Sequence, residues 1–276
     1  MLFARAAWAR MLSAGELEMK IALNGCMGRM GRRIADIAAT SGHEITAAMD
    51  TVHGGQNYGE AIGDKRFGVK IANSYSGGAD VLIDFSTTQG FSARLAECIK
   101  HGTAFVSGTT GLSDAQLAER DVAAKKIAVI QAYNMSVGVN LLISLVKQAA
   151  IKLGPGYDIE IVEMHHRLKA DAPSGTAVAL FNAACEATNR DPKQVARHGR
   201  EGMVGQRTRP EIGLHAVRGG DVVGDHTVMF AGEGERVELT HKASSRDTFA
   251  RGAVRAAEFL KGKPAGLYTM AQVLGL

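Results

Sequence analysis

Short apolar runs alternate with amphipathic stretches over the first half of the chain. Apolar runs at residues 20–25 and 44–50 flank residues 31–42, whose apolar positions recur at helical spacing before a glycine. The same order continues with strands predicted at 79–86, 103–111 and 127–134, and helices at 90–102 and 113–126. Strands that alternate with helices predict a parallel sheet, because a crossover helix is the usual connection between parallel neighbours.

The pattern changes after a long apolar stretch at residues 134–152, which we predict to be a helix ended by the run Gly154 to Gly156. A strand at 157–166 and a helix at 174–189 follow it. Glycine turns then separate strands predicted at 212–218, 225–232 and 235–243, before a helix at 246–261. The second half therefore predicts a separate unit with a more open sheet.

Composition narrows the class of protein. The chain has 276 residues, 46% of them hydrophobic and 22% charged, which suits two compact globular domains. Its net charge is only +4, with 5% aromatic residues, so nucleic acid is not an expected partner. A modest positive field would suit anionic small molecules instead.

Neither a membrane span nor a metal site is predicted. The longest apolar runs, such as residues 137–146, are interrupted by polar residues and fall short of the ~20 needed to cross a bilayer. Cys26, Cys98 and Cys185 lie far apart and form no CxxC pair, which indicates a reducing compartment, the cytoplasm, and no disulfide framework. Residues 1–18 we interpret as an extension or an early start codon, with a targeting helix as the alternative.

A glycine-rich turn after the first predicted strand indicates dinucleotide binding. Gly25, Gly28 and Gly31 lie in the run GCMGRMG, whose spacing departs from GxGxxG. The physical requirements are kept, since glycines allow a tight turn and a helix N-terminus would face the pyrophosphate. Arg29 adds a cation, and Asp50 ends the second predicted strand at the distance expected for a ribose ligand.

The choice between NADH and NADPH stays open at this stage. Asp50 favours NADH, because a carboxylate accepts a hydrogen bond from the 2'-hydroxyl and repels a 2'-phosphate. Arg29 could partly neutralise such a phosphate. The sequence therefore predicts NADH, NADPH or both as cofactor.

A second cluster of candidate functional residues lies at residues 163–176, EMHHRLKADAPSGT. Its histidines, Arg167 and Lys169 precede a predicted helix start at Gly175 and Thr176, where free backbone amides can bind an anion such as a carboxylate. Reduction of an unsaturated bond also needs a proton donor, and His165 or Lys169 is suited to that role. Alone, each would be an ordinary surface charge or strand-end residue, but together they favour a substrate site.

These segments together resemble the dihydrodipicolinate reductases. The resemblance rests on GCMGRMG, DFS at 84–86, SGTTG at 107–111, AYNMSVGVN at 132–140 and HHRLKADAPSGT at 165–176, which occur in the order typical of that family. It runs from about Lys20 to the C-terminus, and the last segment is its most specific motif.

The resemblance implies roles for individual residues. His165 would be the acid/base residue, Lys169 the proton donor, and a small dicarboxylic substrate would bind through its carboxylates. The cofactor-binding residues would be Gly25, Cys26, Met27, Gly28, Arg29, Met30 and Asp50, with Gly108, Thr109, Thr110, Ala132, Tyr133, Asn134 and Met135 on the nicotinamide side. The substrate-binding residues would be His166, Gly175 and Thr176.

The resemblance also implies an α/β fold in two parts. A Rossmann-like parallel-sheet dinucleotide domain would span residues 19–135 and 246–276, with C-terminal helices returning to it. Residues 136–245 would form an α+β substrate and oligomerisation domain with an open mixed sheet, assembled as a homotetramer. The chain departs from some relatives at Thr51, where they carry an arginine after the acidic residue, which weakens the case for NADPH.

Two other functions remain as alternatives. A related dehydrogenase of amino-acid metabolism would share the nucleotide domain, but an acylating aldehyde dehydrogenase would need a nucleophilic cysteine in its substrate site. A nucleotide-sensing regulator would keep the glycine turn and Asp50 but would have no need of His165, Lys169 or the anion-binding helix start.

Overall fold

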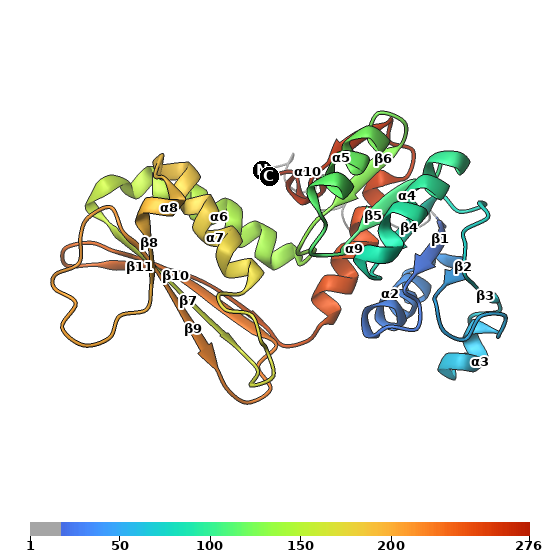
Figure 1. The fold of residues 1–276 in the computed structure, drawn as a ribbon, viewed down its shortest axis with the longest axis horizontal. Helices are drawn as coiled ribbons and strands as arrows, with labels where there is room; N and C mark the ends of the chain where they lie inside the picture. The colour runs from blue at the N-terminus through green and yellow to red at the C-terminus, as the bar shows by residue number, and fades with distance from the viewer. Residues whose placement is uncertain (1–17) are drawn as a thin grey trace, which may run out of the picture. The chain divides into compact units, whose positions relative to one another are not determined.

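The computed structural model describes residues 18–276 and divides them into two compact units (Figure 1). The first unit holds the residues up to Ala132 together with Ala253–Thr269, and the second holds Tyr133–Gly252 and Met270–Leu276. This division differs from the expected domain bounds at three places, because residues 133–135, 246–252 and 270–276 group with the second unit. The predicted extension, residues 1–18, lies outside the described residues except for Glu18.

The first unit is built on a seven-stranded parallel sheet in the order β12-β6-β5-β4-β1-β2-β3. The strands are β1 (Lys20–Asn24), β2 (Glu44–Met49), β3 (Ile71–Ala72), β4 (Val81–Asp84), β5 (Ala104–Ser107), β6 (Ala128–Gln131) and β12 (Gly266–Tyr268). The helices are α2 (Arg29–Thr40), α3 (Tyr58–Ile62), α4 (Thr88–His101), α5 (Asp114–Ala123) and α9 (Asp247–Leu260), which crosses the boundary between the units. The predicted Rossmann-like fold is confirmed.

The strand order locates a ligand crevice in this unit. The chain winds outward from β1 to β3 and then returns to β4 on the other side of β1, so the carboxyl ends of β1 and β4 form the topological switch point. Strands β4 and β5 are buried at every position, as expected for parallel strands covered on both faces. The capping box of α5 also forms, with Ser113 accepting from the amide of Gln116.

The second unit is built on a mixed sheet, as predicted, and its five strands lie in the order β11-β10-β7-β9-β8. Strand β7 pairs parallel with β9 and antiparallel with β10. Its strands are β7 (Asp158–His165), β8 (Ala196–His198), β9 (Ile212–Arg218), β10 (Gly224–Ala231) and β11 (Arg236–Ala243). Its helical segments are α6 (Val137–Leu153), η1 (Gly154–Gly156), α7 (Gly175–Thr188), α8 (Pro192–Val195) and α10 (Met270–Leu274).

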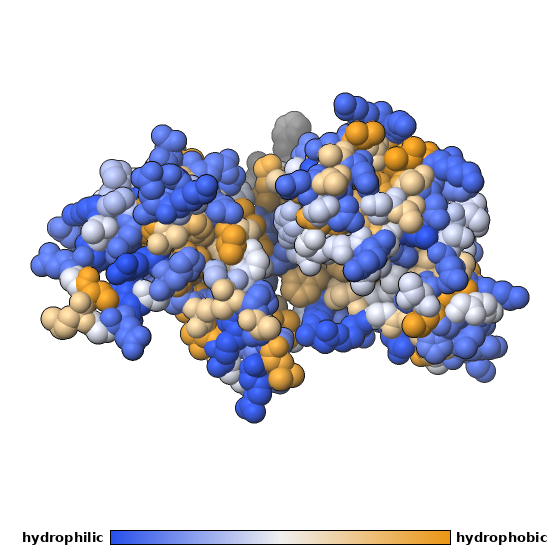
Figure 2. Space-filling view, viewed as in Figure 1, coloured by the Kyte–Doolittle hydropathy of each residue, from blue (hydrophilic) through white to orange (hydrophobic). Residues whose placement is uncertain are grey.

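One face of this mixed sheet carries the core of the second unit. Alternate residues of β7, such as Ile159 and Ile161, are buried against α6 and α7, which lie along that face (Figure 1). Leu142 and Val146 of α6 contribute to the same cluster. The visible surface of each unit is mainly hydrophilic with small hydrophobic patches (Figure 2).

Helix α6 departs from the expectation drawn from the apolar runs. With η1 it forms a helical segment, Val137–Gly156, whose length and composition would suffice to cross a membrane. Polar residues such as Asn140 and Ser144 interrupt the apolar runs of the sequence, but the helix continues through them. Leu142, Val146 and Ala150 of this helix lie in the core of the second unit.

The short elements were not predicted. These are α3, β3, α8, β8, β12 and α10, each of five residues or fewer. Segments of this length carry less than two turns of helix or too few alternations for a strand pattern. Their pairing with neighbours, rather than their own sequence, defines them.

Candidate active site

The glycine turn of the first unit has steric reasons for its composition. Gly25 has a φ of +77°, and a Cβ there would lie 2.7 Å from the carbonyl oxygen of Phe85. A Cβ on Gly31 would overlap the carbonyl oxygen of Gly25, so α2 can approach the turn this closely only through a glycine. The sequence pattern and the steric requirement therefore agree at these two positions.

The backbone amides of this turn fall into two sets. Those of Gly25 and Cys26 donate to the carbonyl of Met49, at 2.9 and 3.1 Å. Gly28, the N-cap of α2, has no side chain to cap the helix, and the amides of Arg29 and Met30 have no acceptor within residues 18–276. The free amides at the α2 N-terminus fit a pyrophosphate, whereas the earlier amides hold the turn.

Asp50 lies directly after β2, beside this turn. Its Oδ2 accepts a hydrogen bond from the amide of Met27 at 2.9 Å. Its Oδ1 accepts from the amides of Thr51 and Val52, at 2.8 and 3.3 Å. The carboxylate is therefore fixed in place, and its remaining lone pairs can accept from a ribose hydroxyl.

A buried carboxylate, Asp84, joins the strand ends around the crevice. It is fully buried and accepts five hydrogen bonds, all from uncharged donors. The donors are Asn24 Nδ2 (2.7 Å), the Ser86 amide (3.2 Å) and Oγ (2.6 Å), Ser107 Oγ (3.2 Å) and Thr109 Oγ1 (2.8 Å). One side chain thus fixes the ends of β1, β4 and β5 relative to one another.

The predicted nicotinamide-side residues of the first unit lie around this carboxylate. A Cβ on Gly108 would overlap the ring of Phe85, so the glycine leaves room for that ring. Thr109 donates through its hydroxyl to Asp84, while Thr110 is exposed. The amide of Ala132 donates to the carbonyl of Ser107 at 3.0 Å.

The remaining residues of that predicted stretch belong to the second unit. Tyr133 is exposed, and Met135 is buried with its carbonyl against Gly252. Asn134 donates from Nδ2 to the hydroxyl of Thr176 at 2.9 Å. Asn134 therefore contacts a residue predicted to bind a substrate carboxylate.

Glu163 and His165 of β7 form the centre of the second unit's polar cluster. Both are buried, and His165 Nδ1 lies 2.6 Å from Glu163 Oε2. Arg218 donates to both oxygens of Glu163, at 2.8 Å each, and the amide of Ser174 donates to Oε1 at 3.0 Å. Burial alone would raise the pKa of Glu163, but the hydrogen bonds from Arg218, His165 and Ser174 outweigh it and leave the pKa below its ordinary value.

His226 of β10 packs against His165, with ring centroids 5.1 Å apart. Its Nε2 lies 2.9 Å from Ser174 Oγ, and the same oxygen accepts a hydrogen bond from the amide of Ala177. Burial lowers the pKa of His226 to about 4, with the nearby charge of His165 adding to the effect. His226 is therefore neutral at pH 7, and Ser174 can donate its hydroxyl hydrogen to Nε2.

The structure places Lys169 and His165 on different carboxylates. Lys169 Nζ lies 2.8 Å from each carboxylate oxygen of Asp171, and His165 is bonded to Glu163 instead. His166 has a buried Nδ1 with no hydrogen-bond partner among the described residues. This unpaired nitrogen leaves His166 available to a ligand.

Helix α7 begins where the sequence predicted an anion site. Ser174 is its N-cap and accepts from the amide of Ala177 at 3.1 Å. The amides of Gly175 and Thr176 have no acceptor in the part of the chain that the structure describes. These two donors and the helix dipole suit a carboxylate.

The cysteines do not supply a nucleophile. All three are buried, and burial raises the pKa of Cys26 to about 12 and that of Cys185 to about 11. The pKa of Cys98 is raised for the same reason. Thiols held protonated in this way do not fit the acylating dehydrogenase alternative. Within residues 18–276, no group of three or more His, Cys, Asp or Glu side chains could hold a metal ion.

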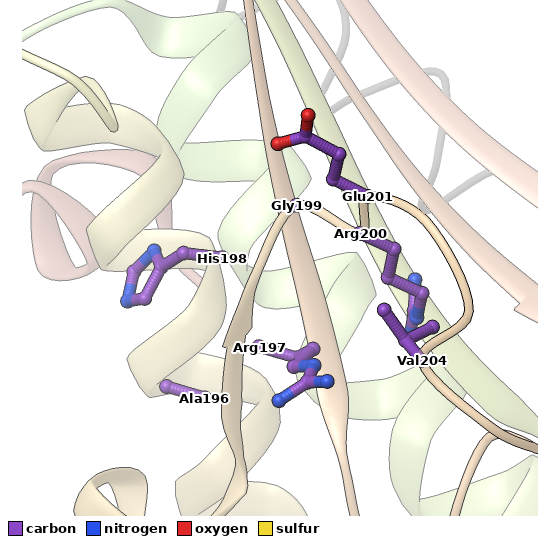
Figure 3. A pocket seen from close by; sticks show the side chains of 7 residues that line it. All are labelled: Ala196, Arg197, His198, Gly199, Arg200, Glu201 and Val204. Carbon is purple, nitrogen blue, oxygen red and sulfur yellow. The ribbon is translucent and has the colours of Figure 1, made fainter.

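A surface pocket of about 500 Å³ lies along β8 and the loop after it (Figure 3). Its lining residues are Ala196, Arg197, His198, Gly199, Arg200, Glu201 and Val204. Arg200 is already paired with Glu160 and Glu211, at 2.8 and 2.9 Å. None of the predicted site residues lines this pocket.

Sequence reasoning missed several residues of the polar clusters. Glu163 could have been found, because residues two apart on a strand share a face and His165 was already a candidate. Asp84 stood in a quoted motif without a role. Arg218 and His226 had no local signal, since each meets the cluster only through the register of β9 and β10 with β7.

Comparisons with known proteins point to one family over nearly the whole chain. A family model described as "Dihydrodipicolinate reductase, N-terminus" matches residues 19–135, and one described as "Dihydrodipicolinate reductase, C-terminus" matches residues 138–274. A protein named 4-hydroxy-tetrahydrodipicolinate reductase from Anaeromyxobacter sp. (strain Fw109-5) is 51% identical over 264 residues, covering 94% of this chain and 98% of the relative. A protein of the same name from Cupriavidus pinatubonensis is 49% identical over 265 residues, covering 94% of this chain and 100% of the relative.

Among solved structures, dipicolinate-bound dihydrodipicolinate reductase from Paenisporosarcina sp. TG-14 has the same fold. The TM-score is 0.72 at 24% sequence identity, and the alignment covers 93% of this chain and 99% of the other.

Proposed function

The chain belongs to the dihydrodipicolinate reductase family, and from this membership we propose how its residues divide the reaction. It is a pyridine-nucleotide-dependent reductase of lysine and diaminopimelate biosynthesis. It reduces hydroxytetrahydrodipicolinate, through dihydrodipicolinate, to tetrahydrodipicolinate. The observation that best supports our assignment of residues is that one carboxylate, Glu163, bonds both to His165 and to the N-cap of α7.

The first unit would hold the dinucleotide. The free amides of Arg29 and Met30 would bind the pyrophosphate, Asp50 the adenosine ribose, and residues 108–110 and Ala132 would line the nicotinamide side. Residues 133–135, to which the family resemblance gives the same role, belong to the second unit. When bound, the reduced nicotinamide supplies a hydride to the conjugated ring of the substrate. We propose that NADH is preferred to NADPH, because the fixed carboxylate of Asp50 repels a 2'-phosphate and Thr51 offers no cation to offset it.

The second unit would hold the substrate and move the proton. The free amides of Gly175 and Thr176, with His166, would bind the substrate carboxylates. His165 or Lys169 would then deliver the proton that completes the reduced ring. The positive charges of Lys169 and the helix N-terminus would stabilise the negative charge that develops before protonation.

The mixed sheet supports the proposal of a homotetramer. The row of Val162, Thr227 and Thr240, and the neighbouring Met164 and Met229, lie on the face opposite the α6 and α7 core. Within the described residues no helix layer covers this face (Figure 1). A sheet face that mixes half-buried apolar side chains with polar ones, and that no helix covers, suits pairing with further copies of the chain. As a biosynthetic reductase of this family, the protein would work in the cytoplasm.

The test of this proposal is a coupled assay of reduced-cofactor oxidation. A separately purified synthase condenses aspartate semialdehyde and pyruvate in the same cuvette, and the loss of near-ultraviolet absorbance is followed with NADH and with NADPH. We expect consumption that depends on both precursors and a higher kcat/KM with NADH. A higher kcat/KM with NADPH would contradict the role given to Asp50.

The same assay tests the proton donors. His165→Gln and Lys169→Ala should each lower kcat by on the order of 10²-fold or more, since acid–base groups contribute about 10²–10⁴-fold. The dissociation constant for NADH should not change, because neither side chain belongs to the dinucleotide unit. Unchanged turnover in both variants would reject the assignment, and a folded wild-type protein that binds NADH but consumes none would favour the sensor alternative.

A further inference from the structure

Glu163 differs from a purely structural buried carboxylate in the kind of partner it has, because an imidazole and a guanidinium are among its hydrogen-bond donors. Its side chain is 1% exposed, and it accepts four hydrogen bonds from three different partners. Arg218 engages both oxygens in a bidentate pair, His165 bonds to Oε2 and the Ser174 amide to Oε1. One carboxylate therefore connects the acid–base histidine, a guanidinium and the first residue before α7.

The strand register brings these partners together. Glu163 and His165 are two apart on β7, so they share the face that α7 covers. Arg218 is paired with His165 across the parallel β7 and β9 ladder, and it also donates to the carbonyl of Asp171 at 2.7 Å. The cluster is thus held by two strands and the loop that carries Lys169.

The ionisation state of Glu163 determines which ring nitrogen of His165 carries a hydrogen. The hydrogen bonds from Arg218 and its other partners keep the pKa of Glu163 below its ordinary value despite burial, so the group is ionised at pH 7. An ionised carboxylate can only accept hydrogen bonds, so Nδ1 of His165 must carry a hydrogen. The bond to Glu163 therefore leaves Nε2 as the nitrogen that can exchange a proton with a substrate.

We propose that Glu163, held by Arg218, is a positioning residue that sets the tautomer of His165 and fixes it relative to the substrate-binding end of α7. This inference rests on the acid–base role proposed for His165. Glu163 itself would contact neither substrate nor cofactor. It would act as the third group that orients a general acid or base, a recurring arrangement in enzymes that use histidine.

The first measurement needs no turnover and no variant of Glu163. Protein labelled with 15N at its histidines is studied by long-range proton–nitrogen correlation, and the signals of His165 are identified by their loss in His165→Gln. We expect the neutral ring in the Nδ1-protonated form. Observation of the Nε2-protonated form would overturn the inference while leaving the proposed function intact.

The second measurement is turnover in Glu163→Gln. The amide has one acceptor oxygen, and its NH2 group must face one of the three groups that donate to the carboxylate in the wild type. The ring of His165 is then less well held, so kcat should fall by on the order of 10²-fold, the lower end of what acid–base catalysis supplies. The kcat/KM profile should move toward lower pH, because a negative charge beside the acid–base group has been removed. Arg218, His226, His241, Lys169 and Asp171 also contribute charge or titration around this group, and they are unchanged in the variant. NADH affinity should stay the same.

A matched control separates positioning from stability. Glu97 of α4 also pairs with an arginine, Arg94 at 2.9 Å, and accepts from the amide of Tyr75 at 3.0 Å. Glu97→Gln should lower the thermal midpoint comparably but leave kcat and the pH profile unchanged. Arg218→Lys keeps the charge but loses the bidentate geometry, so it should lower kcat less than Glu163→Gln does. Equal kcat values in wild type and a folded Glu163→Gln protein would refute the proposal.

Discussion

Two buried carboxylates, one in each unit, lie near the carboxyl ends of strands and are satisfied in opposite ways. Asp84 accepts five hydrogen bonds, all from amides and hydroxyls without charge. Glu163 accepts four, from a guanidinium, an imidazole and one backbone amide. Both avoid the cost of an unpaired buried charge.

The two kinds of donor give the two carboxylates different roles. Asp84 holds the backbone in place, whereas Glu163 controls the position of a proton on His165. The donors around Asp84 cannot titrate near neutral pH, so that cluster can only hold the ends of β1, β4 and β5 in place. The cluster around Glu163 contains an imidazole, so the ionisation of one member constrains the hydrogen position on another. Loss of Asp84 should therefore affect stability and dinucleotide binding, whereas loss of Glu163 should mainly affect turnover.

The largest effect we expect is that of Asp84→Ala. The change leaves the side chains of Asn24, Ser107 and Thr109 without their acceptor, and each such buried donor costs on the order of 1–3 kcal/mol. The free energy of unfolding should fall by about 3–5 kcal/mol, measured by urea denaturation. NADH binding, followed by cofactor fluorescence, should weaken in the same protein because the crevice loops lose their common anchor.

Asp84→Asn provides the comparison within this cluster. It keeps one acceptor oxygen and similar volume, so its loss of stability should be smaller than that of Asp84→Ala. If Asp84→Ala binds NADH as tightly as the wild type, the carboxylate does not shape the crevice, and the role in dinucleotide binding given to Asp84 is wrong.

The two clusters also differ in how far the sequence could predict them. The glycine turn and Asp50 are local features of one βαβ unit, so the periodicity and the glycines were enough to locate them. The donors of Asp84 come from three separate segments, which are the ends of β1 (Asn24), β4 (Ser86) and β5 (Ser107 and Thr109). The convergence of parallel strand ends could have flagged them as a group, but not which hydrogen bonds each makes.

In the second unit, the sequence could predict the residues that are close together in the chain but not those on distant strands. Its substrate segment was predicted because His165, Lys169 and the α7 start lie within a few residues of one another. Arg218 and His226 belong to strands that are distant in sequence, and strand register depends on pairing that a period-two pattern does not specify. The pairing of Lys169 with Asp171 rather than with His165 was likewise outside what spacing could give.

A smaller effect that we expect is a pH-dependent loss of stability in the Glu163 cluster, which contains histidines, and not in the Asp84 cluster. Burial depresses the pKa of His226 to about 4, while the unfolded chain keeps a value of about 6.5. The unfolded state therefore binds more protons between these values, so the stability contribution is complete above pH 6.5 and is lost as the pH falls toward 4. On the scale of 1.36 kcal/mol per pKa unit, the loss from this residue is on the order of 3 kcal/mol.

The measurement is the urea unfolding free energy of wild type and His226→Gln across this range. The difference between the two proteins should shrink as the pH falls, since the variant has no imidazole to protonate. Ser113→Ala serves as the control, because it removes a capping hydroxyl and no titratable group, so its difference from wild type should stay level between pH 6.5 and 4. A constant difference for His226→Gln would show that burial does not depress this pKa.

The smallest effects concern the two helix caps. Ser113 caps exposed α5 in the first unit, and Ser174 caps α7 beside the Glu163 cluster. Ser113→Ala should lower the unfolding free energy by about 1 kcal/mol, the ordinary value of a lost cap, and leave every kinetic constant unchanged. Ser174→Ala should cost more, because Nε2 of His226 then loses its hydrogen-bond donor.

Kinetics decide whether the α7 cap is more than a structural one. If the amides of Gly175 and Thr176 bind a substrate carboxylate, fraying of the first turn in Ser174→Ala should raise the KM for the dicarboxylic substrate and leave that for NADH unchanged. Both constants are read in the coupled assay at saturating levels of the other substrate. Equal losses of stability in the two variants, with an unchanged substrate KM, would mean that the start of α7 is an ordinary capped helix and that the anion site must be sought elsewhere.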